Sequence, residues 1–310
     1  MKAQILKLLR AENGVVSGQA LSAELGISRV SVWKHIKKLR EVGYGIRSFP
    51  NGYQLLRSPD TPFAWEFPGR EASIFYFAEV DSTMDIAKEL ARNGCPNLTV
   101  VVADRQNKGR GRLNRKWLSD AGGLYFTLVL RPEIPIILSS RISFLTSMTL
   151  ARVLREMFDI DARVKWPNDI LVNERKICGV LSEMEAEADR VNFINIGIGV
   201  NVNNDPSRSE PQASSLKVLL GRKIARKDFL RSFLDEFEAQ LHKADLDRVI
   251  SEWKRYTVTL HRRVRIVANH DVSEGTAVDV DANGALILQM ADGSRKKILY
   301  GDCFHRDRKL

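Results

Sequence analysis

Apolar side chains recur at helical spacing through the first 43 residues of the chain. The segments KAQILKLLRAEN, SGQALSAELG and SRVSVWKHIKKLREVG, residues 2–13, 17–26 and 28–43, are amphipathic at the period of an α-helix. A serine begins and a glycine ends the second and third segments, as expected at helix termini. The pattern predicts three helices.

The third predicted helix has two different faces. Val32, Ile36 and Leu39 fall at positions i, i+4 and i+7, so we expect them to face the core. We expect Trp33 to be packed rather than stacked on a base. The polar and basic residues left on the outer face, together with the preceding serine, are Ser28, Arg29, Ser31, Lys34, His35 and Lys38.

Two short strands follow in YGIRSFPNGYQLL, residues 44–56, around the turn signal Pro50-Asn51-Gly52. The order of helix, helix, basic helix and hairpin is that of a winged helix-turn-helix, whose third helix enters the major groove of DNA. The outer face of the third helix is then the predicted DNA-binding surface. A three-helix protein-interaction module is the alternative.

Charge supports this division of the chain. The net charge is +10, and residues 1–58 carry 10 Lys and Arg against 3 acidic residues. Residues 59–255 carry 29 against 28, and residues 256–310 carry 9 against 7. Because phosphate neutralisation needs clustered cations, a basic excess at one end favours a nucleic-acid-binding module. A solvated basic surface is the alternative.

A mixed α/β pattern fills the middle of the chain. Three prolines and no helical period mark residues 59–68 as a linker. Beyond it, apolar runs such as SIFYFAEV alternate with helical segments such as STMDIAKELARNG as far as residue 255. We predict an α+β multidomain protein with a winged helix at 1–58, the linker, and a mixed α/β domain at 69–255. Short strands separated by Asn-Gly and Asp-Gly turns predict a small SH3-like β-barrel at 256–310.

Cysteine usage and hydropathy bear on the compartment. Cys95, Cys178 and Cys303 are far apart, odd in number and without metal-ligand spacing. We therefore expect a reducing, cytoplasmic environment and no metal site. The longest charge-free stretch, residues 191–204, is shorter than the roughly 20 apolar residues of a membrane span. We expect no membrane partner.

The segment RQNKGRGRLNRKW combines a permissive backbone with guanidinium groups. Gly109 and Gly111 allow unusual conformations, and three arginines match phosphate geometry bidentately: Arg110, Arg112 and Arg115. We expect this loop to order only when an anion neutralises it. It lacks the Gly-Lys-Ser/Thr end of a Walker loop and the spacing of a dinucleotide fingerprint. An RNA-binding run and a solvated charged loop are the alternatives.

Polar groups also stand at the ends of two predicted strands. Lys165 precedes a turn at Asn168-Asp169, where its ammonium group can act as a point charge on a carboxylate or phosphate. Ser82 and Thr83 lie at a strand-to-helix junction, where hydroxyls and free N–H groups can bind a polar ligand. Taken alone, the first is also compatible with a surface lysine and the second with helix caps.

Five motifs in this order resemble one family. DST before a helix, Q-x-x-GRGR-x-x-RKW, KWPNDI with K-x-x-G-x-L-x-E, GIGVN-x-N and ASSL together are similar to motifs of the biotin protein ligases. The winged helix in front resembles that of the bifunctional members, which also repress biotin genes. The resemblance spans nearly the whole chain, domain order included.

The resemblance implies an activity and its partners. Such an enzyme, with a class II synthetase-like ligase domain, joins biotin to ATP to give biotinyl-5′-AMP and then transfers biotin to a lysine of biotin carboxyl carrier protein. It implies biotin, ATP and Mg²⁺ as cofactors, and operator DNA bound by a homodimer. A ligand-sensing transcription factor without ligase activity and a lipoate or octanoyl transferase of the same fold are the alternatives.

The family motifs also imply site residues. The biotin contacts would be Ser82, Thr83, Met84, Gln106, Arg110, Gly111, Arg112 and Lys165. The catalytic charges would be Lys165, Arg110 and Arg112. The contacts to nucleotide or Mg²⁺ would be Arg115, Trp117, Asn168, Asp169 and Asn201.

Two positions depart from the family pattern. Met84 stands where Asn is common, so a side-chain amide contact to biotin is lost or replaced by a backbone contact. Leu113-Asn114 stands where many members carry a small residue such as Gly, and we expect slower loop closure.

Overall fold

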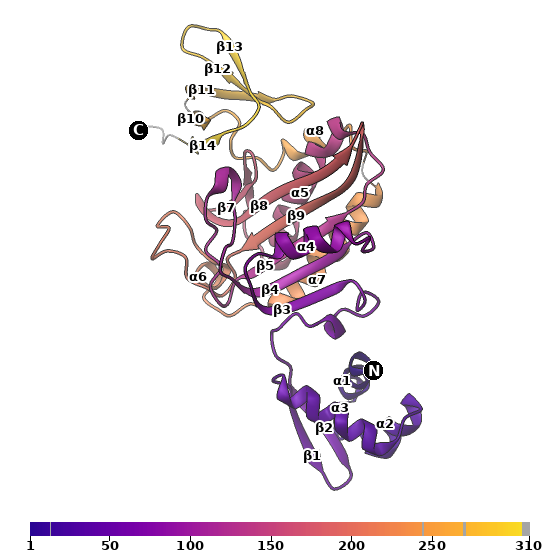
Figure 1. The fold of residues 1–310 in the computed structure, drawn as a ribbon. Coiled ribbons are helices and arrows are strands. Elements are labelled where there is room, and N and C mark those ends of the chain that lie inside the picture. Colours follow the sequence, from indigo (N-terminus) through magenta and orange to yellow (C-terminus); the bar gives the residue numbers. More distant parts are fainter. Residues whose placement is uncertain (13, 244, 269–270, 306–310) are drawn as a thin grey trace. The chain divides into compact units, whose positions relative to one another are not determined.

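The chain divides into two compact units, Met1–Ala72 and Ser73–Leu310, in a computed structural model (Figure 1). The structure describes residues 1–12, 14–243, 245–268 and 271–305. The first unit contains the basic third helix, and the second contains the loop rich in glycine and arginine.

The first unit has the predicted order of three helices and a hairpin. Its elements are α1 (Lys2–Ala11), α2 (Gly18–Leu25), α3 (Arg29–Glu41), β1 (Gly45–Phe49) and β2 (Gly52–Arg57). The hydroxyls of Ser17 and Ser28 accept the N–H groups of Ala20 and Ser31, at 2.9 and 3.2 Å, and so cap α2 and α3. The core includes Ile5, Leu6, Leu21, Val32, Ile36 and Leu39. The winged helix-turn-helix prediction is confirmed.

Two side chains of α3 depart from the expected pattern. Trp33 is 50% exposed, so the expectation that it is packed is wrong. It lies roughly 100° around the helix from Val32, at the margin of the buried stripe. His35 is only partly exposed, and its Nδ1 is buried without a hydrogen-bond partner in the described part of the chain. Burial, followed by the charges of Lys38, the N-terminus and Lys2, lowers the pKa of His35.

Residues 59–68, expected to be a linker, contact the rest of the first unit. They contain the 3-10 turn η1 (Ala64–Glu66), and Glu66 is 1% exposed. The Glu66 carboxylate accepts the Arg10 guanidinium at 2.8 Å and the Tyr44 phenol. Trp65 Nε1 donates to the Tyr44 hydroxyl at 3.0 Å. The segment is therefore a folded part of the first unit. The limits of the DNA-binding and ligase domains at residues 58 and 68 remain a prediction.

A seven-stranded mixed sheet forms the middle of the second unit. Its order is β3-β4-β5-β9-β8-β7-β6; β3 and β4 are parallel and the other neighbours are antiparallel. The strands are β3 (Ile74–Val80), β4 (Thr99–Gln106), β5 (Leu124–Leu130), β6 (Arg163–Lys165), β7 (Asp169–Val172), β8 (Arg175–Glu187) and β9 (Arg190–Val200). The mixed α/β prediction is confirmed.

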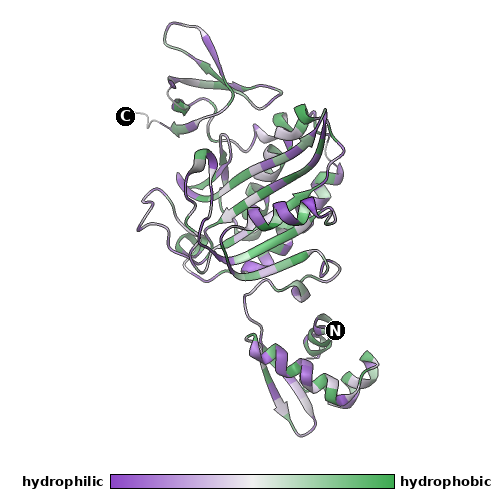
Figure 2. Ribbon diagram, viewed as in Figure 1, coloured by the Kyte–Doolittle hydropathy of each residue, from purple (hydrophilic) through white to green (hydrophobic). Residues whose placement is uncertain are grey.

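Helices cover both faces of this sheet. Ala87 and Ala91 of α4 pack with Val129 of β5, whereas Phe126 of the same strand meets Phe233 of α7 edge to face. Residues an odd number apart on a strand point to opposite faces, so α4 and α7 lie on opposite sides, with α5 beside α7 (Figure 1). Covered on both faces, β4 and β5 are mostly hydrophobic (Figure 2).

The helices of this unit are α4 (Thr83–Arg92), η2 (Arg112–Asn114), η3 (Ile136–Leu138), α5 (Ser139–Phe158), α6 (Leu216–Leu220), α7 (Arg226–Lys243) and α8 (Val249–Trp253).

The segment Ile136–Phe158, made of η3 and α5, is long and apolar enough to cross a membrane by composition alone. Most of its apolar window is buried inside the unit, and α5 contacts α7, α8 and the sheet. A core helix passes the same test, so the composition gives only weak support for a membrane span.

The C-terminal strands form a second, antiparallel sheet with the order β13-β12-β11-β10-β14. They are β10 (Arg263–Ala268), β11 (Asp271–Val280), β12 (Leu286–Gln289), β13 (Arg295–Ile298) and β14 (Asp302–His305). Within the described residues β13 and β14 are the two edges and do not pair, so this sheet is open and no closed barrel is formed. The predicted β-rich C-terminal region is confirmed, and the barrel is not.

Candidate active site

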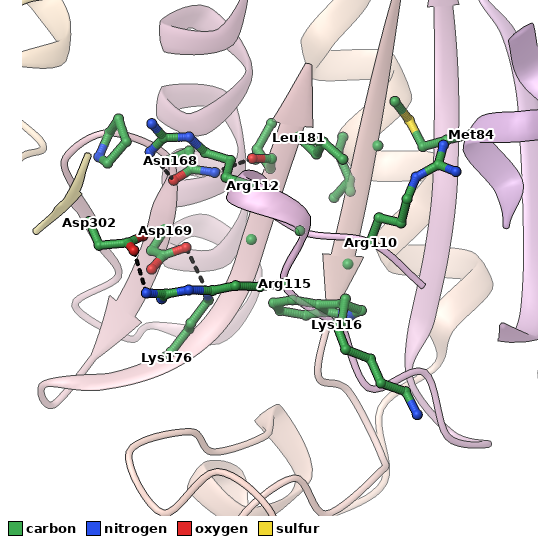
Figure 3. Close-up of a pocket in the computed structure, with 18 of the residues that line it drawn as sticks. Met84, Arg110, Arg112, Arg115, Lys116, Asn168, Asp169, Lys176, Leu181 and Asp302 are labelled. Carbon is green, nitrogen blue, oxygen red and sulfur yellow. Dashed lines mark hydrogen bonds and ion pairs between the residues drawn. The ribbon is translucent and has the colours of Figure 1, made fainter. Parts of the chain in front are cut away.

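A cavity of about 180 Å³ lies where several elements of the second unit meet (Figure 3). Its walls come from the β3–α4 junction, the loop after β4, the β6–β7 turn, β8, β9 and β14. Six basic and three acidic side chains line it. This excess of positive charge favours an anionic ligand.

The register of two parallel strands builds the polar end of the cavity. Val80 at the end of β3 lies beside Gln106 at the end of β4, so the following Ser82-Thr83 junction faces the glutamine amide. Gln106 Oε1 accepts both the N–H and the hydroxyl of Thr83, at 2.9 and 3.0 Å. Gln106 Nε2 donates to Ser119 Oγ at 2.9 Å. These bonds fix the amide and leave its second N–H to a ligand.

Met84 occupies the position next to this polar end. Ser82 Oγ accepts the Met84 N–H at 3.3 Å, so the backbone of Met84 serves the helix cap. Its side chain is buried and lies over Gly197 of β9, where an added Cβ would come within 2.7 Å of the sulfur. A glycine in the GIGVN motif thus leaves room for Met84. The cavity gains an apolar wall where the family commonly has an amide.

The loop after β4 is folded as a hairpin, and its ordering on an anion stays a prediction. Trp117 N donates to Gly109 O at 2.9 Å, and Gly111 N donates to Arg115 O at 2.7 Å. A Cβ on Gly109 would lie 2.5 Å from Trp117 O and 2.6 Å from Ser119 Oγ, so only glycine fits there. Cross-strand bonds therefore define the backbone path of the loop in this conformation.

Leu113 lies at the exposed tip of this loop in a left-handed conformation, with φ 53° and ψ 38°. An L-residue costs roughly 1–2 kcal/mol there, a cost that glycine does not carry. The left-handed backbone conformation therefore explains why glycine suits this position in the family pattern. Slower loop closure stays a prediction, and the Asn114 side chain lies outside the described part of the structure.

Trp117 packs on a floor made of two glycines. Gly179 of β8 and Gly199 of β9 are paired in register, and a Cβ on either would lie within 2.8 Å of the indole ring. Lys176 Nζ lies 5.1 Å from the ring centroid. The indole Nε1 is buried and has no hydrogen-bond partner among the described residues. Trp117 thus lines the cavity, and its indole N–H donates no hydrogen bond to the described residues.

Two cations of the cavity have no ion-pair partner in the described part of the chain. Lys165, at the end of β6, lies with its Nζ 5.9 Å from the Phe304 ring. Arg112 Nη1 donates to Asn168 Oδ1 at 3.5 Å and to Gly301 O at 3.4 Å. Burial lowers the pKa of Arg112, although a guanidinium group stays protonated in proteins. Both charges are available to an anion.

Arg110 is in a different electrostatic state. Its Nη2 lies 2.7 Å from Asp85 Oδ1 and 3.7 Å from Glu183 Oε1. Two carboxylates therefore offset its charge, and it is weaker than Lys165 and Arg112 as a group for binding an anion.

Two further ion pairs join separate walls of the cavity. Arg115 of the loop pairs with Asp302 of β14, and Lys176 of β8 pairs with Asp169 of β7 at 2.8 Å (Figure 3). The charges of Asp302 and Asp169 partly oppose the lowering of the Arg112 pKa by burial. The loop, the central sheet and the C-terminal sheet therefore meet at one charged site.

The structure brings together nearly all of the predicted ligand contacts. Those lining the cavity are Ser82, Thr83, Met84, Gln106, Arg110, Gly111, Arg112, Arg115, Trp117, Lys165, Asn168 and Asp169. Asn201 does not line it: its side chain is buried and its Oδ1 accepts Asn204 Nδ2 at 3.0 Å.

The sequence reasoning missed Lys176, Asp302 and Phe304, which also line the cavity. Lys176 begins the K-x-x-G-x-L-x-E motif, so its signal was present. Asp302 and Phe304 have no such signal, because only the tertiary fold carries β14 to the loop.

Comparisons with known proteins match most of the chain. Residues 76–203 match the biotin/lipoate A/B protein ligase family, residues 2–54 an HTH domain, and residues 259–306 the biotin protein ligase C-terminal domain. The chain is 34% identical over 302 residues to the bifunctional ligase/repressor BirA of Bacillus subtilis, covering 93% of each chain. It is 29% identical over 305 residues to that of Escherichia coli, covering 92% of this chain and 91% of that protein.

A solved structure shares the fold of most of this chain. The biotin protein ligase from Aquifex aeolicus in complex with biotin and ATP superimposes with a TM-score of 0.64 at 29% identity. The match covers 76% of this chain and 98% of that one. The similarity therefore extends to a protein that binds both ligands.

Proposed function

The chain belongs to the family of bifunctional biotin protein ligases and repressors, and from this premise we propose how its own residues carry out the activity. It is a biotin protein ligase that uses biotin and ATP, and its helix-turn-helix domain makes it a repressor as well. The residue roles given below are supported by contacts in the cavity.

Biotin is proposed to bind with its polar ring at the β3–α4 junction. Ser82, Thr83 and the free N–H of Gln106 offer the hydrogen-bonding groups there. Met84 contributes an apolar wall instead of a side-chain amide. The carboxylate end of biotin then points towards the cations of the loop and of β6.

Adenylation brings two anionic groups together. A biotin carboxylate oxygen attacks the α-phosphorus of ATP, a new O–P bond forms, and the bond to the β-phosphate breaks with release of pyrophosphate. Lys165 and Arg112 are proposed to offset the charge that builds up, because both lack an ion-pair partner in the described residues. Trp117, with its unused Nε1, is proposed to cover the nucleotide.

Transfer then consumes the mixed anhydride. The amine of an acceptor lysine attacks the biotinyl carbonyl carbon, AMP leaves, and the amine loses a proton. The loop is proposed to exclude water meanwhile, since water would hydrolyse the anhydride. Its link to Asp302 of β14 supports this role.

Mg²⁺ is proposed to arrive with the nucleotide. The described residues contain no group of three or more His, Cys, Asp or Glu able to hold a metal ion. The cavity carboxylates Asp169 and Asp302 are each paired with a cation. A resident metal site therefore does not fit these residues.

The remaining partners are proposals drawn from the family. The acceptor is proposed to be biotin carboxyl carrier protein, and the adenylate to promote a homodimer on operator DNA in the cytoplasm. The predicted outer face of α3, including Arg29, Lys34 and Lys38, is proposed to contact that DNA. We also propose a class II synthetase-like fold for the central sheet and an SH3-like relationship for the open C-terminal sheet. The proposed domain limits lie at residues 58, 68 and 255.

The observation that carries the proposal is the convergence, beside a fixed polar end at Gln106, of Lys165 and Arg112, which form no ion pair with any described residue. The test mixes the full chain with biotin, γ-labelled ATP and a biotin carboxyl carrier domain. We expect biotin-dependent pyrophosphate release and a biotinylated acceptor lysine. Pyrophosphate release without biotinylation of the carrier domain would contradict the proposed acceptor alone. Absence of biotin-dependent pyrophosphate release would contradict the ligase assignment. Replacing biotin with lipoate tests the transferase alternative, for which we expect no product.

A further inference from the structure

The exposed face of α3 contains apolar side chains that packing in the first unit does not explain. Val30 is 61% exposed and Trp33 is 50% exposed, one helical turn apart. Arg29, Lys34 and Lys37 surround them on the same side of the helix. Large exposed apolar side chains grouped among cations mark an interaction surface more often than a solvated one.

This face borders a groove whose walls are fixed. The groove is lined by α2, α3 and the β1–β2 hairpin, and it includes Arg29, Val30 and Trp33. Val16 and Tyr53 exchange backbone hydrogen bonds at 2.8 and 2.9 Å, which tie the hairpin to the segment before α2. A Cβ on Gly52 would lie 2.1 Å from Val16 O, so glycine is required for that contact. The hairpin therefore holds a set position beside α3.

Charge identifies the occupant of this groove. Residues 1–58 carry 10 basic against 3 acidic side chains. In the described part of the chain, Arg29, Lys34, Lys37 and Lys38 have no carboxylate partner. A duplex of nucleic acid supplies both a polyanionic backbone for these cations and apolar groups in its major groove, namely the C5-methyl groups of thymine.

The other flank of α3 is less suited to reading bases. The Ser28 and Ser31 hydroxyls lie 3.0 Å apart and bond to each other at the helix cap. His35 is partly buried, with its Nδ1 out of reach of solvent. Residues near the N-terminus of a recognition helix contact base edges, and Val30 and Trp33 are in that half of α3.

We propose that Val30 and Trp33 contact thymine methyl groups in the major groove of the operator, while Arg29, Lys34 and Lys37 contact the phosphates. This inference rests on the proposed repressor function. It assigns sequence reading to two apolar side chains, whereas Ser31 and His35 contribute little to specificity.

The test uses the full chain with biotin and ATP to select binding duplexes from a random pool. Each thymine of the selected duplex is then replaced by deoxyuridine, which removes only the methyl group. We expect about fourfold weaker binding at one or more positions, the size expected for one buried methyl-sized group. Trp33→Ala and Val30→Ala should each bind the thymine duplex at least as weakly as the parent binds the deoxyuridine duplex. Each variant should also bind the thymine and deoxyuridine duplexes with equal affinity at the position it contacts.

Leu56→Ala is the matched control, because Leu56 is equally exposed in the first unit but does not line the groove. It should bind like the parent. Because the substitutions lie in the first unit, a far-UV circular dichroism spectrum and a melting curve like those of the parent show that each variant is folded. If a duplex is selected but neither deoxyuridine nor the Val30 and Trp33 substitutions change its affinity, the reading of thymine is overturned. If no duplex is selected at all, the repressor function fails and takes this inference with it.

Discussion

Arg115 and Asp302 form an ion pair between the loop after β4 and strand β14, although they are 187 residues apart in the chain. Arg112 of the same loop also donates to Gly301 O at 3.4 Å. Two contacts thus attach the loop to the C-terminal sheet. The position of the loop over the cavity therefore depends on a region that contributes no strand to the central sheet.

Breaking this attachment should shorten the lifetime of the bound adenylate. We expect Asp302→Asn to release biotinyl-5′-AMP up to about fivefold faster, the limit for a partly exposed ion pair. The dissociation rate is measured by chasing labelled adenylate with unlabelled biotin and ATP. Asp271→Asn is the control, because Asp271 pairs with Lys296 at 2.8 Å on the same sheet, outside the cavity. Equal rates for the two variants would contradict the attachment.

Lys165 and Arg112 should dominate the adenylation step. We expect Lys165→Ala or Arg112→Ala to reduce adenylate formation by about 10²-fold or more, the order for losing one charge-stabilising group. Pyrophosphate release at saturating biotin and ATP measures the effect. Normal turnover in both variants would refute the site assignment.

Arg110 should matter less than its neighbour in the loop. Because Asp85 and Glu183 already offset its charge, we expect Arg110→Ala to reduce adenylate formation by less than about tenfold. The same assay with Arg112→Ala in parallel gives the comparison. A loss for Arg110→Ala as large as that for Arg112→Ala would show that Arg110 leaves its carboxylates and acts on the substrate.

The glycine floor under Trp117 should be intolerant of a side chain. In Gly199→Ala the new Cβ would lie 2.4 Å from the indole, so the ring must move. We expect at least tenfold weaker binding of ATP, measured by titration, with biotin binding less affected. Gly14→Ala is the control, since no atom lies within 4 Å of its added Cβ. Equal ATP affinity in the two variants would exclude a nucleotide role for Trp117.

Features fixed by local chemistry could be predicted from the sequence. The caps at Ser17 and Ser28 and the buried stripe of α3 depend on residues three or four positions apart, and the structure has them as predicted. Trp33 shows the limit of that reasoning. At the margin of the stripe, its exposure depends on what packs beside the helix, which periodicity does not contain.

Features fixed by tertiary contacts could not be predicted in the same way. The family motifs located the loop and Lys165, but nothing in the tail indicates that Asp302 meets Arg115. The carboxylates that neutralise Arg110 come from α4 and β8, so its pairing appears only in the folded chain. Asn201 directly follows β9 within the GIGVN-x-N motif, yet its side chain bonds to Asn204 instead of lining the cavity.

His305 should make the second unit sensitive to mild acid. Burial, followed by the charges of Lys165 and Arg262, lowers the pKa of His305 from 6.5 to about 4, and its side chain is 9% exposed. The unfolded chain therefore takes up this proton first, so the stability contributed by the neutral imidazole is lost as pH falls from about 6.5 to about 4. We expect the urea midpoint to fall over this range, and to fall less in His305→Gln.

His242→Gln, at an exposed position, is the control and should keep the parent slope. His35 is the same in all three proteins, so the difference in slope reports on His305 together with Glu174, whose pKa His305 helps to lower. Parallel slopes in all three proteins would show that the imidazole is protonated equally in the folded and unfolded states.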